Sequence, residues 1–390
     1  MTMKTKFPNA AFFVLVTGLL LAGFAKTLLL PKDINYYENR YACKIYAPTW
    51  ETVQSQWFQN NLENALADQI PAAQRLKKAY NTASSQYLQT FLEPMAQAYP
   101  NRYLNYMGHR LFDEHLVYEP RDAASTAAAM TLRAEQLNTL TALHPELPVH
   151  VYYIEKDTDI NFETGERIEA GDQLLSQLHI PEERKGLFAV DSFDSFSQLF
   201  YKTDHHWNLH GSYEAYLQLL PLLECEDTPL TPGEETTLSS SFSGSKAAGT
   251  GSELFAETFS AYPFAFPPMD ITINGQPASD YGDQEGFFHG TASGLSYGAF
   301  YGGDEGEVLL DTGNAERENL LIIGESYDNA LLKLLASHYH VTHAVDLRYY
   351  AHYMGTPFSF SDYVQAHSID RVLLIGNIDF FVLDDFILEN

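Results

Sequence analysis

The sequence predicts an α/β fold in which helices cover both faces of a doubly wound parallel sheet. The main observation is the order of patterns near the C-terminus, where apolar strands at 320–323, 343–345 and 372–375 alternate with helices at 330–338 and 360–366. A β-α-β-α-β order implies parallel strands, because each helix carries the chain back to the same end of the sheet. The continuous apolar run at 320–323 also indicates a strand that is buried on both faces.

Further patterns extend this fold toward the N-terminus. The run at 148–154 is β-branched and aromatic and is bounded by proline and charge, which is typical of a buried strand, and 186–191 resembles a shorter one. Asn208 is expected to cap a helix at 209–223. Residues 225–310 are rich in Gly, Ser, Thr, Pro and Tyr, so we expect an irregular insertion with a few short strands there.

The chain between residues 31 and 145 is predicted to be mostly helical. Apolar residues recur at helical spacing over 49–70, 72–96 and 123–143. We therefore expect a helical N-terminal segment, 31–145, that packs on an α/β domain formed by 146–390.

Residues 1–30 have the layout of an export signal. Residues 10–25 form an apolar run without charge behind Lys4 and Lys6, and Lys26 follows the run. The run is short for a membrane span, which needs about 20 residues, so both an uncleaved signal-anchor and a cleaved signal peptide stay open. Because positive charges precede the run, the body of the protein is expected outside the cytoplasm, either anchored to the membrane through this segment or secreted.

Composition excludes one large class of function. The 390 residues include 23 basic and 51 acidic side chains, and the formal net charge is −28. Such a surface repels phosphate backbones, so we expect no binding of nucleic acid. The apolar content of 45% is enough for a sizeable core. Cys43 and Cys225 are the only cysteines and their spacing matches no metal or redox motif; whether they form a disulfide stays open.

A candidate nucleophile lies at the first strand-to-helix junction of the C-terminal β-α-β-α-β region. Ser326 follows the strand at 320–323 after Gly324, which allows a sharp turn. Parallel sheets place ligand sites at the carboxyl ends of their strands, and the free N–H groups of a following helix would favour a developing oxyanion. The backbone N–H of Ser326 could belong to the oxyanion hole. The alternative is that Ser326 only caps the helix.

A candidate base lies in the segment TDHHWN at 203–208. Asp204 and His206 project to the same side of an extended chain, so the carboxylate can orient the imidazole as in a catalytic triad. His205 is the alternative base. A hydrolase with a metal at Asp204, His205 and His206 is a further hypothesis, but neighbouring histidines rarely share one ion. We therefore expect no metal and no cofactor.

Three segments together resemble a known family. TDHHWN, the later IIGESYDNALLKLL at 322–335 and VDLRYY at 345–350 resemble the DHHW family of bacterial exported proteins. That family is similar to the alginate O-acetylation proteins of the AlgX and AlgJ type, in the SGNH/GDSL hydrolase-like superfamily. The resemblance implies an SGNH-hydrolase-like sheet and a catalytic set of Asp204, His206 and Ser326.

The sequence departs from the family pattern at two places. Glu325 stands before the serine, where the family often has aspartate. The asparagine that contributes to the superfamily's oxyanion hole has only a loose counterpart in Asn377, and Gly303 is a second candidate, through its backbone N–H. If neither lines the pocket, stabilisation of an oxyanion depends on the backbone N–H of Ser326.

The resemblance and the residues together predict an extracytoplasmic serine-dependent acyl transferase or esterase, with acetyl as the expected group. Its acceptor would be a cell-envelope or secreted polysaccharide, and a membrane-bound O-acyltransferase is the partner that the resemblance implies. A neutral or partly cationic glycan is expected, unless basic residues such as Arg348 gather near the site. The alternative is a catalytically inactive carbohydrate-binding or scaffold protein with the same fold.

Overall fold

An eight-stranded sheet organises the larger part of the computed structural model. Its strand order is β13-β12-β14-β16-β15-β17-β6-β9. The strands, in chain order, are β6 (Val149–Ile154), β9 (Lys185–Phe188), β12 (Asp270–Ile273), β13 (Gln276–Ala278), β14 (Glu307–Asp311), β15 (Leu320–Ile323), β16 (Val341–Val345) and β17 (Arg371–Asn377). The structure describes residues 6–29, 34–35, 40–69, 73–106, 109–250 and 255–383.

The sheet is mixed, which corrects the predicted wholly parallel sheet. Strands β16, β15, β17, β6 and β9 pair in parallel, and the predicted β-α-β-α-β region supplies three of them. Strands β14, β12 and β13 pair antiparallel and extend one edge. All three antiparallel strands lie in the insertion predicted to be irregular over 225–310, and β14 extends one residue beyond it. Antiparallel neighbours can be joined by short turns and need no crossover helix.

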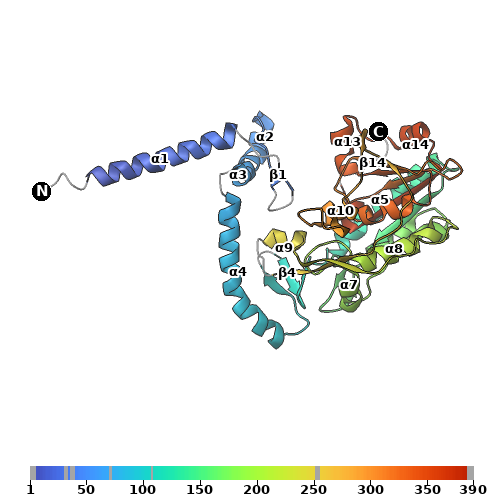
Figure 1. Cartoon of the computed structure of the whole chain (residues 1–390), viewed down its shortest axis with the longest axis horizontal. Coiled ribbons are helices and arrows are strands. Elements are labelled where there is room, and N and C mark those ends of the chain that lie inside the picture. Colours follow the sequence, from blue (N-terminus) through green and yellow to red (C-terminus); the bar gives the residue numbers. More distant parts are fainter. Residues whose placement is uncertain are drawn as a thin grey trace. The chain divides into compact units, whose positions relative to one another are not determined.

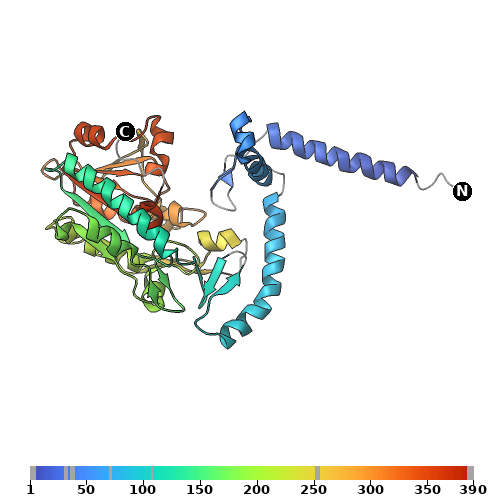
Figure 2. The ribbon, with the colours of Figure 1, turned by 180° about the vertical axis from the view of Figure 1, so that it is seen from behind.

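Helices cover both faces of this sheet, as the sequence predicted. Leu320 and Ile322 of β15 face one core with α8 (Leu209–Leu222) and α12 (Leu332–Ala336). Leu321 and Ile323 face the other core. That second core is closed by α5 (Ala123–Leu143), α6 (Ala170–Gln177) and α14 (Phe360–His367). Helix α5 crosses the sheet in the foreground of Figure 2.

The remaining elements of this part of the chain are short. The helices are α7 (Phe193–Leu199), α10 (Gln284–Phe288), α11 (Tyr297–Tyr301), α13 (Leu347–Met354) and α15 (Ile378–Phe381), with 3-10 turns η1 (Glu182–Arg184) and η2 (Asp328–Ala330). The strands are β3 (Leu104–Tyr106), β4 (His109–Phe112), β5 (His115–Val117), β7 (Ile160–Asn161), β8 (Glu166–Arg167), β10 (Thr236–Phe242) and β11 (Glu257–Ala261).

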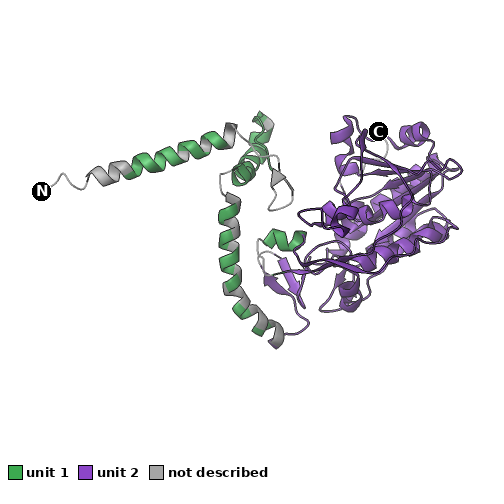
Figure 3. Ribbon diagram, viewed as in Figure 1, with its two compact units in different colours: residues 1–97, 245–255 green, residues 98–244, 256–390 purple. Residues whose placement is uncertain are grey.

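The chain divides into two compact units, which Figure 3 distinguishes by colour. Unit 1 comprises residues 1–97 and 245–255, and unit 2 comprises residues 98–244 and 256–390. Residues 98–145, which the sequence patterns placed in the N-terminal segment, therefore cluster with the sheet. Cys43 lies in unit 1 and Cys225 in unit 2, and among the described residues no disulfide joins them.

Unit 1 is largely helical (Figure 1). Its elements are α1 (Lys6–Leu29), α2 (Trp50–Gln54), α3 (Trp57–Gln69), α4 (Ala73–Ala98, whose last residue belongs to unit 2), α9 (Ser245–Thr250), β1 (Ile34–Asn35) and β2 (Arg40–Tyr41). No helix among the described residues is both long enough and apolar enough to cross a membrane. The signal-anchor predicted for residues 1–30 is therefore not confirmed by the structure.

Several helix boundaries differ from the sequence patterns. The helix predicted over 49–70 is interrupted because Gln56 adopts a left-handed φ of 60°. The helix predicted at 330–338 is shorter, since η2 precedes α12 and the last turn ends at Ala336. In contrast, α5 begins after the cap residue Asp122 and covers 123–143 as predicted, and Asn208 caps α8.

Candidate active site

Ser326 lies in the turn that follows β15, at the carboxyl end of that strand. A Cβ atom at Gly324 would lie 2.3 Å from Oδ2 of Asp328, so the close packing of the turn requires glycine. The backbone N–H of Asp328 closes the turn on the carbonyl of Glu325 at 2.9 Å. The α-helix begins only at Leu332, so Ser326 does not directly precede it as the sequence predicted.

The TDHHWN segment, 203–208, connects β-bridge residue Phe200 to α8 and is anchored at its end. The Trp207 ring is fully buried and packs against Tyr327, with 5.4 Å between ring centroids. The side chain of Asn208 accepts hydrogen bonds from two backbone N–H groups in the first turn of α8. Trp207 and Asn208 therefore fix the chain directly after the histidines, the first by packing and the second by capping α8.

A half-buried carboxylate from the insertion anchors the start of the segment. Glu257 of β11 accepts hydrogen bonds from the backbone N–H of Lys202 at 3.0 Å, and from the backbone N–H and hydroxyl of Thr203 at 2.7 and 2.6 Å. The N–H of Gly244 donates to the same threonine hydroxyl at 2.9 Å. Burial raises the pKa of Glu257, although these hydrogen bonds act in the opposite direction.

The structure brings Asp204, His206 and Ser326 together in the geometry that a triad requires. Nδ1 of His206 lies 2.6 Å from Oδ1 of Asp204, and its Nε2 lies 2.8 Å from Oγ of Ser326. Asp204 is 3% exposed and His206 is 6% exposed, so solvent competes little for these hydrogen bonds. The arrangement can move a proton from the serine to the imidazole while the carboxylate holds the ring.

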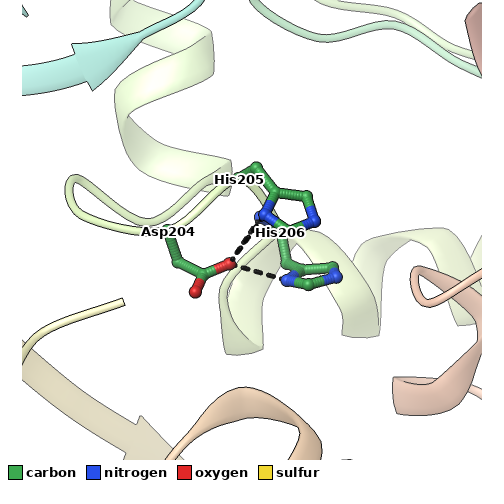
Figure 4. Close-up of side chains that lie close together, drawn as sticks. All are labelled: Asp204, His205 and His206. Carbon is green, nitrogen blue, oxygen red and sulfur yellow. Dashed lines mark hydrogen bonds and ion pairs between the residues drawn. The ribbon is translucent and has the colours of Figure 1, made fainter. Parts of the chain in front are cut away.

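His205 takes a different place from His206 (Figure 4). Its Nδ1 lies 3.6 Å from Oδ1 of Asp204, which is too far for a hydrogen bond. Its ring centroid lies 3.8 Å from that of His206 at an angle of 36°. The geometry therefore favours His206 over His205 as the base for Ser326, because His206 is the imidazole that contacts the serine oxygen.

One aromatic residue beside the triad has no signal in the sequence. Tyr297 of α11 stacks on the ring of His206, with 3.7 Å between centroids and 1° between the ring planes. It comes from the insertion at 225–310, where no motif or periodic pattern distinguishes one tyrosine from another. Only the tertiary structure reveals this contact.

A pocket of about 480 Å³ opens beside Ser326 and is lined by residues from several loops. Aromatic, cationic and acidic side chains contribute to it, namely Tyr118, Tyr327, Arg121, Lys156, Arg348 and Asp379. The amine of Lys156 lies 2.7 Å from Oδ2 of Asp379, and Arg121 also hydrogen bonds to that carboxylate. Arg348 pairs with Asp346, whose Oδ2 lies 2.5 Å from Nη2. Basic residues thus gather at the pocket, but each lies against a carboxylate.

Asn377 and Gly303, the candidates for the oxyanion hole, lie in different surroundings. Asn377 ends β17 and lines the pocket with Ser326, but its side-chain amide donates to Oε1 of Glu325 at 2.5 Å. Gly303 is not part of this pocket lining, and its carbonyl accepts a hydrogen bond from Tyr281 at 2.7 Å. The oxyanion role of both residues stays a prediction.

Glu325 links the serine turn to two other parts of the pocket. Its carboxylate is 7% exposed and lies between the amide of Asn377 and the guanidinium of Arg348, which is 3.8 Å away. Burial raises the pKa of Asp346 to about 6, while its hydrogen bonds with Arg348 lower it. The side chain of Glu325 itself spans from the serine turn to Asn377 at the end of β17.

Two groups of described residues offer donor atoms for a metal. In the first, Asp204, His205 and His206, the ring nitrogens of His206 already bind the carboxylate and the serine. The second contains Cys225, Asp227 and His338. There Asp227 accepts from a guanidinium 2.5 Å away. In the second group, this guanidinium opposes binding of a metal cation to the same carboxylate. In the first group, a metal would have to displace the hydrogen bonds that His206 makes with Asp204 and Ser326.

Comparisons with known proteins rest on structure, since no family model and no curated protein matches the sequence. Bacillus cereus PatB1 with a sulfonyl adduct superposes with a TM-score of 0.55 at 17% identity, covering 74% of this chain and 100% of that one. A DHHW family protein from Eubacterium siraeum gives a TM-score of 0.53 at 17% identity, covering 73% of this chain and 95% of that one.

The O-acetyltransferase domain of Pseudomonas putida AlgJ also matches, at 10% identity over 70% of this chain and 91% of that one, but its TM-score of 0.37 is too low to support an argument. The first two comparisons agree with the sequence motifs. This chain therefore has the fold of a DHHW family protein, as its TDHHWN and Gly-Glu-Ser segments implied.

Proposed function

We propose that this chain is an extracytoplasmic serine-dependent acyl transferase or esterase that acts on a cell-envelope or secreted polysaccharide, with acetyl as the transferred group. The observation that carries the proposal is the continuous hydrogen-bonded chain from Asp204 through His206 to Ser326, whose oxygen faces a pocket. A buried carboxylate, an imidazole and an accessible hydroxyl in this order are the requirements for an activated serine nucleophile.

In the first step, Oγ of Ser326 attacks the carbonyl carbon of an acyl ester and its proton passes to Nε2 of His206. Asp204 stabilises the imidazolium through Nδ1. The tetrahedral intermediate then collapses, the bond between the carbonyl carbon and the donor alcohol breaks, and the alcohol leaves with the proton from His206. The product of this step is an acyl ester of Ser326.

In the second step, a hydroxyl group of the acceptor gives its proton to His206 and attacks the acyl carbon. The bond to Oγ of Ser326 breaks and the serine recovers the proton. A sugar hydroxyl as acceptor gives acyl transfer, and water gives hydrolysis. The backbone N–H of Ser326 is the expected oxyanion donor, since the amide of Asn377 is held by Glu325.

The fold comparison supports this proposal at a coarse level. PatB1 was solved with a sulfonyl adduct, and the second similar structure is that of a DHHW family protein. By analogy, we expect Ser326 to react with a sulfonyl fluoride. The family resemblance adds acetyl as the group and a membrane-bound O-acyltransferase as the partner that delivers it.

The charges that line the pocket indicate which kind of acceptor glycan would bind. Arg121 and Lys156 share the carboxylate of Asp379, and Arg348 is paired with Asp346, so the lining combines donors and acceptors without a large excess of either charge. A neutral glycan, which offers many hydroxyl groups, suits such a lining better than a polyanion. Turnover of a neutral acceptor should therefore vary less with ionic strength than turnover of an anionic one.

The test is covalent labelling with phenylmethylsulfonyl fluoride together with release of p-nitrophenol from p-nitrophenyl acetate. We expect the adduct on Ser326, and loss of both adduct and turnover in Ser326→Ala. Ser176→Ala, which removes an exposed hydroxyl on α6, is the matched control and should retain both. Absence of any signal that depends on Ser326 would remove the enzyme proposal.

One observation favours a second candidate, an inactive carbohydrate-binding or scaffold protein. The side-chain amide of Asn377 donates to Glu325, and Gly303, which was predicted to donate through its backbone N–H, is not part of the pocket lining. This candidate predicts glycan binding that is equal in the wild type and in Ser326→Ala, without turnover in either. Calorimetric titration with a neutral oligosaccharide separates it from the enzyme.

A further inference from the structure

The imidazole of His206 has an unusually close aromatic neighbour. The ring of Tyr297 lies parallel to it, with 3.7 Å between centroids and 1° between planes. The ring of Tyr327 is farther away, at 5.1 Å and 53°, and forms no parallel stack. The ring of His205 lies 3.8 Å from that of His206 but is tilted by 36°, so Tyr297 of α11 is the residue that forms a parallel stack on the imidazole.

The core holds Tyr297 in this position. It is the first residue of α11, and the side chain of Ser296 caps the helix by accepting from the N–H of Ala299 at 3.1 Å. Tyr297 is 4% exposed, and Phe300 of the same helix is 1% exposed in the core. Burial raises the pKa of Tyr297 well above its ordinary value, so the stacking partner is a neutral phenol.

This contact acts on the same ring that makes the two hydrogen bonds of the triad. The bonds to Asp204 at 2.6 Å and to Ser326 at 2.8 Å leave from opposite nitrogens and lie in the plane of the imidazole. Rotation of the ring about its bond to Cβ would break both of them. A parallel ring at van der Waals distance opposes that rotation, because the imidazole would collide with it.

The contact also has an electrostatic consequence. The face of a phenol ring carries negative charge density and attracts a cation placed above it. When Nε2 of His206 takes the proton of Ser326 the imidazole becomes a cation, so this attraction grows as the proton is transferred in the transition state. An interaction of that kind accelerates the reaction rather than only tightening substrate binding.

We propose that Tyr297 is a positioning residue for the general base: it holds the plane of the His206 ring between Asp204 and Ser326 and stabilises the imidazolium that forms during acyl transfer. This inference rests on the proposed function, since it assigns a role within that reaction. It assigns Tyr297 no contact with the substrate.

The test compares three variants in turnover of p-nitrophenyl acetate. Tyr297→Leu should lower kcat by about tenfold to a hundredfold with little change in KM, because the stack acts in the transition state. Tyr297→Phe keeps the ring and should retain most of kcat. Phe300→Leu is the matched control, since it removes a buried ring from the same helix that does not stack on His206.

A double-mutant comparison separates positioning from a general structural role. If Tyr297 acts through His206, then Tyr297→Leu should cause no further loss of the residual rate in a His206→Ala background. Equal losses in both backgrounds, or equal losses in Tyr297→Leu and Phe300→Leu, would overturn the inference. Failure of the proposed function itself is distinct, because Ser326→Ala would then retain the wild-type rate.

Discussion

Two of the described histidines have the same two kinds of hydrogen-bond partner, a carboxylate at Nδ1 and a hydroxyl at Nε2. For His206 these partners are Asp204 at 2.6 Å and Ser326 at 2.8 Å. For His338 they are Asp227 at 3.0 Å and the phenol of Tyr216 at 2.7 Å. The connectivity is identical, yet only one of these chains ends at a group that a substrate can reach.

The difference lies in the hydroxyl and its surroundings. The oxygen of Ser326 lines a pocket at the end of a strand. Tyr216 is fully buried and accepts the backbone N–H of Leu230 at 2.8 Å, and burial raises the pKa of its phenol to about 12. A chain of hydrogen bonds therefore predicts catalysis only when its terminal oxygen is both accessible and nucleophilic; otherwise it contributes to stability.

The largest expected effect separates the two histidines by activity. If the serine mechanism holds, His206→Ala should lower kcat by about 10³ to 10⁴, as removal of a triad base does in serine hydrolases. His338→Ala should leave kcat within about twofold, because neither His338 nor its partners Asp227 and Tyr216 are among the described residues that line the pocket of Ser326. Steady-state hydrolysis of p-nitrophenyl acetate measures both, and similar losses in the two variants would erase the distinction.

A smaller loss of activity is expected when a larger residue crowds Asp204, the carboxylate partner of His206. A Cβ atom at Gly244 would lie 2.4 Å from Cβ of Asp204, so Gly244→Ala must displace the aspartate or its loop. A displacement of about 1 Å in a catalytic group costs roughly a hundredfold in rate. Gly298→Ala, whose added Cβ would meet nothing closer than 3.8 Å, is the control. A fully active Gly244→Ala enzyme would show that Asp204 tolerates movement.

Breaking the hydrogen bonds of His338 should lower the stability of the fold and not the activity. Tyr216→Phe leaves Nε2 of His338 and the N–H of Leu230 without their shared partner, which should cost about 1–3 kcal/mol in the free energy of unfolding. We expect kcat to stay unchanged. Urea unfolding monitored by circular dichroism gives the free energy, and a loss of activity at full stability would contradict the structural role of this histidine.

The smallest effect concerns pH. The hydrogen bond from His338, followed by that from Arg317, holds the pKa of Asp227 below its ordinary value. A depressed carboxyl pKa stabilises the fold above the unfolded value of about 4, and this stabilisation is lost as pH falls through the folded pKa. Asp227→Asn should therefore unfold with a weaker dependence on pH in the acid range. A steeper dependence than in the wild type would contradict the sign.

The contacts of the triad follow from local patterns. The spacing of Asp204 and His206 and the position of Ser326 after an apolar strand marked each residue as a candidate, and the family resemblance implied that the three act together. The chain at 202–206 is bent rather than extended as predicted, and Asp204 also accepts the backbone N–H of His206. Their catalytic roles stay predictions until activity is measured. The parallel centre of the sheet followed from the same kind of local evidence.

The rest of the site depends on contacts that no local pattern encodes. Glu257 reaches Thr203 across 54 residues, and Tyr297 reaches His206 from a short helix within an irregular region. The alternating run at 270–273 did predict a short strand, which is β12, but brief runs among glycine and proline show too few alternations to predict that β12 to β14 form one edge of the main sheet. The positions of these residues are determined by tertiary packing, so neither composition nor local sequence patterns could predict them.

The strand order of the sheet also sets the time at which the site can exist in a newly made chain. Strand β17 separates β15, which carries the serine turn, from β6, and it pairs with both. The hydrogen bond between His150 and Val372 joins positions 222 residues apart. At about 5–20 residues per second, a ribosome needs roughly 10 to 45 s to progress from β6 to β17. Throughout that interval β6 lacks the neighbour that separates it from β15, so the sheet that supports the serine turn is completed only after nearly the whole chain has been made.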